Sequence, residues 1–342
     1  MLLAFVWGSK PGTAVLVFVG LWLAASVLAA VHHAEVVAHR VGEPFGSLVL
    51  AVAVTVIEVA LIITLMVSTD SDTSTLARDT AFAAVMITLN GIVGLSLLFG
   101  TLRTRLAEFN AEGTASALAT VLTLTTLTLV VPNFTTSASG AEFSGSQLAF
   151  AAVASIGLYG LFVVVQTVRH RDFFLPVGEA TGDDSHADPP TDRDAWTSLG
   201  LLVVSLIAVV GLAKTESPAI EDAVDAIGAP QSAVGVVIAL LVLLPETLAA
   251  VRNARRGRVQ TSFNLAYGSA MASIGLTIPA IAIASIWVDG PLTLGLESTQ
   301  IVLLAITAAV SGLTVLPGRA TLQESGVHLA LFAAFLFLAI NP

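Results

Sequence analysis

The chain contains no cysteine, and charged residues are scarce in it. The absence of cysteine excludes disulfide bonds and thiolate metal sites. Charged residues make up only 11% of the sequence, against roughly 25% in a typical soluble domain. Hydrophobic residues make up 56%, and the mean hydropathy is +0.91. This balance predicts a chain that lies mostly within a membrane.

Ten long apolar segments divide the sequence. They cover residues 11–36, 46–68, 79–100, 115–134, 146–168, 197–214, 231–251, 259–286, 296–316 and 325–341. Most of them reach the roughly 20 residues that span the ~30 Å hydrocarbon core of a bilayer. No alternating apolar and polar pattern competes with them, which disfavours an outer-membrane barrel. We therefore predict an all-α polytopic membrane protein with about ten transmembrane helices.

The first ten residues, MLLAFVWGSK, hold too few apolar side chains to cross a bilayer. They also lack the long apolar core and the cleavage site of a signal peptide. We interpret residues 1–10 as a leader or a truncated, vestigial first helix.

Basic residues are distributed unevenly among the loops. Eleven of the fourteen lysines and arginines fall in the loops after segments one, three, five, seven and nine. The loops after the even-numbered segments hold only Arg78 and Lys214, and Lys10 belongs to the leader. Because positively charged loops stay in the cytoplasm, the odd-numbered loops are expected to be cytoplasmic. The expected location is the inner, cytoplasmic membrane.

A weak internal repeat relates the two halves of the chain. AEVVAHRVGEP at 34–44 aligns with IEDAVDAIGAP at 220–230, which places Gly42 on Gly228. IVGLSLL at 92–98 resembles SIGLTIP at 273–279, which places Gly94 on Gly275. Five helices per half force the second half into the opposite orientation, and inverted repeats of this kind are typical of secondary transporters.

The repeat divides the chain into two five-helix units. We assign residues 11–168 to the first repeat and residues 197–342 to the second, inverted repeat. Residues 169–196 between them are expected to form an acidic, solvated cytoplasmic linker. Within it, residues 178–196 hold six carboxylates around two adjacent prolines, at Glu179, Asp183, Asp184, Asp188, Asp192 and Asp194.

Two glutamates, Glu58 and Glu246, lie inside apolar segments, and each segment is the second of its half. A charged side chain at the bilayer centre costs at least about 2.5–3.5 kcal/mol. A lone glutamate can also serve a helix-to-helix hydrogen bond, but two at matched positions favour a paired site for a cation or a proton. Pro245 precedes Glu246 and is expected to break or kink that helix.

Hydroxyl and amide side chains near these glutamates could complete a coordination shell, although small residues also allow helices to pack closely. The candidate supporting residues are Thr55, Asn90, Asn264, Ser269 and Ser273. At the end of the first segment His32, Glu35 and His39 recur at helical spacing. They form either an interfacial cap or a cytoplasmic-side proton relay. His328, in the last segment, is expected to be a structural histidine.

Three stretches carry a resemblance to a known family: HHAEVVAHRVGEPFGSLVLAVAVTVIEVALI, LLPETLAAVRNARRGRVQTSFNLAYGSAMASIGLTIPA and HLALFAAFLF. They resemble the bacterial ChaA-type cation/proton antiporters, in the cation/proton exchanger family of the calcium/cation antiporter superfamily. The resemblance covers about residues 20–340. It implies an extra first helix followed by two inverted five-helix repeats, each with an acidic residue that binds cation or proton. Those acids map onto Glu58 and Glu246.

The resemblance also bears on the transported ion. Calcium-selective relatives carry an asparagine-rich GN-x-x-E pattern, which is replaced here by VTVIE and LLPE. Sodium, potassium and calcium therefore all stay open. We expect an antiporter that moves protons in and a small cation out by alternating access, with Glu58 and Glu246 binding cation and proton in competition.

Other functional classes fit the sequence less well. No metalloprotease, nucleotide-binding or serine hydrolase motif occurs, so the chain is not expected to be an enzyme. A cation channel with an acidic pore lining is the alternative function. The expected partners are small inorganic cations, protons and the lipid bilayer, with no cofactor and no nucleic acid. The sequence leaves a homo-oligomer open.

Overall fold

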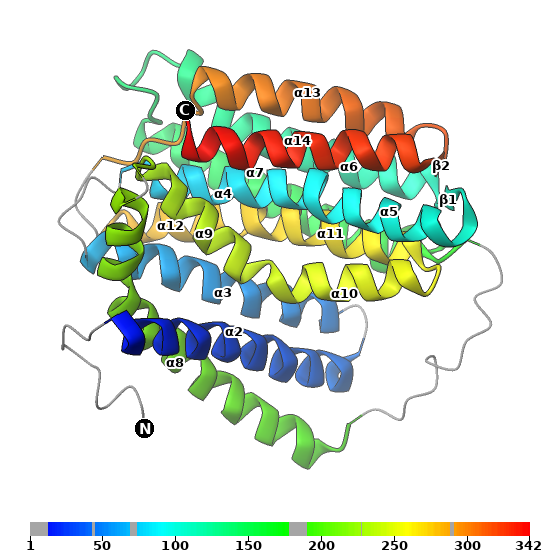
Figure 1. Ribbon diagram of the computed structural model, residues 1–342, viewed down its shortest axis with the longest axis horizontal. Helices are drawn as coiled ribbons and strands as arrows, with labels where there is room; N and C mark the ends of the chain where they lie inside the picture. The colour runs from blue at the N-terminus through cyan, green and yellow to red at the C-terminus, as the bar shows by residue number, and fades with distance from the viewer. Residues whose placement is uncertain (1–12, 43–44, 69–73, 178–189, 227, 288–290) are drawn as a thin grey trace.

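The computed structural model describes residues 13–42, 45–68, 74–177, 190–226, 228–287 and 291–342. Most of these residues are helical, and the long helices run side by side along the longest axis of the molecule (Figure 1). Within the described residues, nine helical stretches are long and apolar enough to cross a membrane, and one bent helix pair makes a tenth. The expectation of about ten transmembrane helices is confirmed.

The elements of the first half follow the chain in a simple order. They are α2 (Thr13–Val41), α3 (Phe45–Ser68), α4 (Leu76–Met86), the π-helix η1 (Ile87–Ile92), α5 (Val93–Thr104), β1 (Ala107–Glu108), α6 (Ala111–Thr125), the π-helix η2 (Thr126–Val130), the 3-10 helix η3 (Val131–Phe134), α7 (Gly145–Val164), the π-helix η4 (Val165–Arg169) and the 3-10 helix η5 (Arg171–Phe174). The run from α4 to α5 forms one span, as does the run from α6 to η3.

The second half repeats this plan. It contains α8 (Asp192–Ala226), α9 (Ser232–Val242), α10 (Leu244–Arg255), α11 (Val259–Gly275), α12 (Thr277–Ala284), α13 (Ser298–Val315), β2 (Arg319–Ala320) and α14 (Leu322–Ile340). The seventh span is the bent pair of α9 and α10, and the eighth joins α11 to α12.

One end of the bundle collects the loops that follow the odd-numbered spans; we call it the arginine-rich end. There β1 pairs with β2 in antiparallel register, so that Ala107 faces Ala320 and Glu108 faces Arg319. This pairing ties the loop after the third span to the loop after the ninth (Figure 1). Both loops were predicted to lie on one side of the membrane, and they do share one end of the bundle.

The glycines that the repeat matches have matching roles. Gly42 follows α2 with φ +75°, and Gly228 lies in the corresponding place after α8 with φ +70°. A left-handed backbone after a helix favours glycine because glycine has no Cβ to clash. The two halves therefore end their first helix in the same way.

Gly94 and Gly275 allow close helix contacts that are equivalent under the repeat. A Cβ on Gly94 would lie 3.0 Å from Leu329 of α14, the last helix of the second half. A Cβ on Gly275 would lie 2.9 Å from Tyr159 of α7, the last helix of the first half. Each half thus packs its third span against the fifth span of the other half.

The third and eighth spans form the centre of the bundle. Every residue of α4 and η1 is buried, as are most residues of α11. The pair of α2 and α8 lies on one side of this centre and α13 with α14 on the other (Figure 1). Glu58 lies on α3 and Glu246 on α10, and both helices contact α11 of the central spans.

Candidate cation and proton site

Glu58 is sealed into the packed interior of the bundle. It lies near the middle of α3, and its side chain is only 2% exposed. Its Oε2 accepts a hydrogen bond of 2.8 Å from the Ser273 hydroxyl of α11, whereas Oε1 has no partner. The hydrogen bond joins the first repeat to the second at the carboxylate.

Two further hydroxyls near Glu58 also lack a partner. Thr277, at the start of α12, interacts with the same carboxylate without making a full hydrogen bond. Thr55 lies one helical turn before Glu58 and is buried, with its hydroxyl unpaired. Buried polar atoms are nearly always paired, so a cluster of unpaired oxygens is expected to serve a ligand, a proton or water. The Glu58 region offers such a cluster.

Glu246 lies at the break in the seventh span. The axes of α9 and α10 differ by 51°, and the break falls at Leu243. Pro245 occupies the first turn of α10, where its missing N–H leaves no helical bond unmade. Glu246 follows in the same turn, next to the positive end of the helix dipole. Its Oε2 is buried and has no hydrogen-bond partner.

A cavity of about 210 Å³ leads from Glu246 toward the arginine-rich end of the bundle. It is enclosed by the first half of α3, by most of α11 and by the last turns of α7 with η4. Its polar lining residues are Tyr159, Gln166, Glu246, Thr261, Asn264 and Ser269. Because Leu50, Ala51 and Val54 supply the α3 wall, the cavity ends about one turn before Glu58.

The two glutamates act on each other. Glu58 and Glu35 each lie close enough to Glu246 for their charges to repel it. Like charges in a medium of low dielectric repel strongly. A proton or a cation bound near the pair would relieve this repulsion.

The structure distributes the predicted supporting residues unevenly. Ser273 binds Glu58, while Ser269 and Asn264 line the cavity beside Glu246. The Asn264 amide is fixed by two bonds: it donates to the Phe174 carbonyl at 2.6 Å and accepts from Gln260 at 2.9 Å. Its carbonyl and amide groups therefore already have protein partners.

Asn90 is held on the other side of the central span. Its amide donates to the Thr307 hydroxyl at 3.0 Å, and its Oδ1 lies 3.3 Å from Nδ1 of His328. Nε2 of His328 lies 3.1 Å from the Thr314 hydroxyl. Because Asn90 Oδ1 can only accept, this network requires the proton of a neutral His328 on Nδ1. His328 is thus the hydrogen-bonded structural residue that the sequence suggests.

The predicted relay residues lie at the arginine-rich end of α2. His32 and Arg252 both act electrostatically on Glu35, which itself acts on Glu246. Glu35 therefore lies within electrostatic range of both Arg252 and Glu246. His39 lies on the exposed face of α2, near its end.

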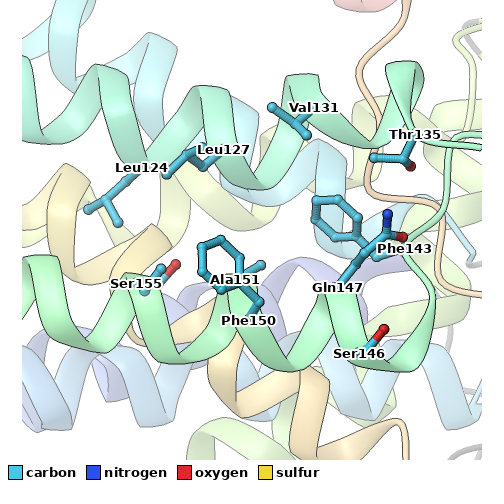
Figure 2. A pocket seen from close by; sticks show the side chains of 11 residues that line it. Leu124, Leu127, Val131, Thr135, Phe143, Ser146, Gln147, Phe150, Ala151 and Ser155 are labelled. Carbon is cyan, nitrogen blue, oxygen red and sulfur yellow. The ribbon is translucent and has the colours of Figure 1, made fainter. Parts of the chain in front are cut away.

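Another, larger cavity has a different character. It measures about 240 Å³ and lies between the α6, η2 and η3 run and α7 (Figure 2). Phe150 and Ala151 of α7 face Leu124 and Leu127 across it, and no charged side chain lines it. Since it holds no counter-charge for a cation, we do not place the ion site there.

Two polar groups were not identified as sites from the sequence. One is the network that joins Thr307 and His328 to Asn90, of which only Asn90 was predicted as a supporting residue; the other is an ion cluster in which Arg78 contacts Asp79 and Glu297. The sequence signal that could have indicated the ion cluster is the pair of charged residues, Arg78 and Asp79, at the edge of an apolar segment. Within the described residues, no three His, Asp or Glu side chains come together in a way that could hold a metal ion.

The family model described as "Sodium/calcium exchanger protein" matches residues 11–168 and 197–341. The chain belongs to this family. Membership in the sodium/calcium exchanger family confirms the kinship that the motifs around Glu58 and Glu246 indicated.

Two bacterial proteins are similar to this chain over nearly its whole length. The "Putative ionic transporter y4hA" of Sinorhizobium fredii (strain NBRC 101917 / NGR234) is 45% identical, and the match covers 100% of this chain and 92% of the relative. The "Sodium-potassium/proton antiporter ChaA" of Escherichia coli (strain K12) is 33% identical over 98% of this chain and 92% of that protein. A solved structure of native YfkE superimposes with a TM-score of 0.75 at 16% identity, covering 97% of this chain and 93% of that one. The exchanger fold is thereby confirmed.

Proposed function

We propose that this chain is a secondary active antiporter that exchanges protons for small cations across the inner membrane, with Glu58 and Glu246 as the exchanging groups. The observation that carries the assignment is a pair of carboxylates from opposite halves, each with a buried unpaired oxygen and within electrostatic range of the other. Kinship with an antiporter at 33% identity supports exchange over a channel.

Competition between cation and proton couples the two fluxes. With both carboxylates ionised, their repulsion favours a bound cation, which neutralises them. With protons bound, the same oxygens lose their charge and release the cation. When a cation or protons are bound, the site is nearly neutral, and the protein can change from the conformation open to one side of the membrane to the conformation open to the other. When the site is empty, its two negative charges disfavour this change. This is the requirement for exchange without a leak.

The conformation described here is open toward the arginine-rich end. The cavity reaches Glu246 from that side. Near the opposite end α9 packs closely on α4, because a Cβ on Gly235 would lie 2.9 Å from the Thr80 amide nitrogen. By the positive-inside rule the arginine-rich end is cytoplasmic. We therefore interpret this form as the one that exchanges ions with the cytoplasm.

The oxygens near the two glutamates favour a permissive site. Calcium prefers six to eight oxygen ligands, and the side chains that approach Glu58 supply few beyond Ser273, Thr55 and Thr277. One similar family member is named a sodium-potassium/proton antiporter. We propose sodium and potassium as substrates, with calcium as a weaker one.

The test is proton-coupled flux in proteoliposomes that contain a pH-sensitive dye, driven in turn by sodium, potassium and calcium gradients. Glu58→Gln and Glu246→Gln should each reduce the coupled flux at least about 100-fold, because each removes a charge that the cation needs. Glu216→Gln is the matched control, since Glu216 is a buried glutamate of α8 near Gly20 of α2. Equal losses in all three variants, or coupled flux in either of the first two, would contradict the assignment.

A further inference from the structure

The internal repeat pairs two buried hydroxyl residues, Ser96 of α5 and Thr277 of α12. The alignment of IVGLSLL with SIGLTIP places Ser96 on Thr277. Both side chains are fully buried, and neither hydroxyl has a hydrogen-bond partner among the described residues. The alignment holds in the folded chain, because Gly94 and Gly275 make equivalent contacts two residues before them. Ser96 and Thr277 therefore occupy equivalent places in the two halves.

The unpaired hydroxyl of Ser96 is unusual within its span. Four other hydroxyls of the α4, η1 and α5 run donate to a backbone carbonyl four residues earlier, those of Thr80, Thr88, Thr101 and Thr104. This bond satisfies a hydroxyl inside a helix without a partner from another helix. Since buried polar atoms are nearly always paired, a hydroxyl that lacks the local bond is available to a group on a neighbouring helix.

Ser96 lies on the face of α5 that packs against α10. Arg103 follows Ser96 by seven residues, which is about two helical turns, so the two side chains share a face. Nη1 of Arg103 donates to the Arg255 carbonyl at the end of α10, at 2.9 Å. The Phe99 ring, one turn after Ser96, lies against the Arg255 guanidinium at 4.3 Å from the ring centroid. This face of α5 is therefore turned toward α10, the helix that carries Glu246.

Ser96 and Glu246 lie at a similar level along the bundle. Both α5 and α10 run toward the arginine-rich end, where Arg103 meets Arg255 (Figure 1). At about 1.5 Å per residue, Ser96 lies roughly 10 Å before Arg103 along α5. By the same measure, Glu246 lies roughly 13 Å before Arg255 along α10. The two side chains therefore start at levels within about one helical turn of each other, although the Ser96 hydroxyl and Glu246 Oε2 are both unpaired in this conformation.

The Glu58 side of the site shows the equivalent arrangement with its hydroxyls engaged. There α12 packs against α3, and both Ser273 and Thr277 approach the Glu58 carboxylate. Under the repeat, the contact between α5 and α10 is the equivalent of this one. The first half has an isoleucine in the place of Ser273. Ser96 is therefore the hydroxyl that this alignment offers to Glu246.

We propose that Ser96 donates a hydrogen bond to Glu246 when the protein is open to the opposite, outer side. This inference rests on the proposed exchange at Glu58 and Glu246. In the outward-open conformation the bent α9–α10 span straightens, and Glu246 is sealed as Glu58 is in the present one. Because Ser96 binds Glu246 in one of the two conformations, it stabilises that conformation relative to the other. Ser96 thereby sets how tightly the outer face binds the cation.

The test compares sodium-driven proton flux at the two membrane faces of the full-length protein. Inside-out vesicles present the cytoplasmic face and right-side-out vesicles present the outer face, both from a host strain that lacks its own sodium/proton antiporters. Ser96→Ala removes the donor from the outward-open form. It should therefore raise the sodium concentration for half-maximal flux about tenfold at the outer face, and should not raise it at the cytoplasmic face. Thr277→Ala should have the reverse effect, because Thr277 serves Glu58 in the form described here.

Two further variants separate the hydrogen bond from packing. Ser96→Thr keeps the hydroxyl, and threonine is the residue that the second half has at this place. It should keep the outer-face affinity within about twofold of the wild type. Thr101→Ala removes a buried hydroxyl of the same helix that donates to the Leu97 carbonyl at 2.7 Å, and should leave the affinity at both faces unchanged.

The sidedness of Ser96→Ala decides the outcome. An equal rise at both faces, or no rise at the outer face, would overturn the proposal. If Ser96→Ala loses all flux, recovery in Ser96→Thr supports the role of the hydroxyl, whereas lack of recovery assigns the loss to packing and contradicts it. Failure of the exchange assignment is distinguishable, because it shows as coupled flux in Glu58→Gln or Glu246→Gln whatever Ser96→Ala does.

Discussion

The two glutamate helices occupy the same place in their repeats but have different shapes. α3 runs without interruption past Glu58, which is sealed against Ser273. The equivalent span of the second half bends by 51° and presents Glu246 to a cavity. Inverted-repeat transporters alternate access when the two repeats exchange such conformations. The difference between α3 and the α9–α10 pair is therefore a feature of one state, which the opposite state is expected to reverse.

The two ends of the bundle differ in the same sense. Toward the arginine-rich end a cavity of about 210 Å³ lies between the first half of α3 and the facing side of α11. At the opposite end α9 lies against α4 with no room for a side chain at Gly235. Closure at one end thus coexists with opening at the other.

Among variants that keep both glutamates, the largest effect is expected where the closed end is forced apart. In Gly235→Leu the new side chain would start 2.9–3.0 Å from the backbone of Asp79 and Thr80. Overpacking typically costs about 1–3 kcal/mol, and more when backbone must move. We expect proton-coupled sodium flux to fall at least about tenfold and the melting temperature to drop by several degrees. The matched control is Gly200→Leu in α8, because nothing lies within 4 Å of a Cβ there. Wild-type flux and stability in Gly235→Leu would show that the closed end is not tight.

The next effect compares open and sealed positions on one helix. Ser269 and Ser273 lie one turn apart on α11, yet Ser269 lines the cavity and Ser273 is 3% exposed beside Glu58. The chain has no cysteine of its own. A hydrophilic maleimide added at the arginine-rich side should label Ser269→Cys at least about tenfold faster than Ser273→Cys. The reason is that Ser273 becomes accessible only when the sealed site opens, and an opening free energy above about 1.4 kcal/mol slows labelling by more than tenfold.

Labelling is read by mass shift after quenching, with Ser139→Cys and Arg256→Cys as reporters of the two membrane sides. Both reporter positions are exposed, and they avoid the left-handed backbones of Gly140 and Gly257. Equal rates at the two α11 positions would remove the distinction between a cavity at Glu246 and a seal at Glu58. Labelling of both reporters from one side would contradict the inverted orientation.

The sequence predicts the spans and the two glutamates because both are compositional signals. A ten-segment hydropathy pattern needs no tertiary information, and a glutamate such as Glu58 is conspicuous within a run of Val, Leu and Ile. Pro245 likewise marks the place where α9 and α10 diverge. The assignment of these residues to ion binding stays a prediction that the flux measurements test.

The rest of the site depends on contacts that have no local signal. Asn90 lies in a π-helical turn, which adds a residue to the turn and changes the direction of the side chains around it. Its partners Thr307 and His328 follow more than 200 residues later. Arg78 and Glu297 meet across 219 positions, through a helix cap that hydropathy does not detect. Such pairings follow only from the way the two repeats dock.

The smallest expected effect distinguishes the two carboxylates by their hydroxyl neighbours. Ser273→Ala removes the 2.8 Å hydrogen bond to Glu58 and leaves a buried carboxylate oxygen unpaired, at a cost of about 1–3 kcal/mol. Without the Ser273 hydroxyl, the Glu58 carboxylate is no longer held in one orientation for the cation. The ratio of sodium to potassium affinity should therefore change several-fold, while the maximal rate changes less.

Ser269→Ala alters only the cavity wall and should shift the ratio by less than about threefold, or under about 0.7 kcal/mol. Ser273→Thr keeps a hydroxyl and should restore most of the preference, which separates loss of the hydrogen bond from loss of volume. A larger shift in Ser269→Ala than in Ser273→Ala would assign ion preference to the bent helix of the second repeat instead of the straight helix of the first.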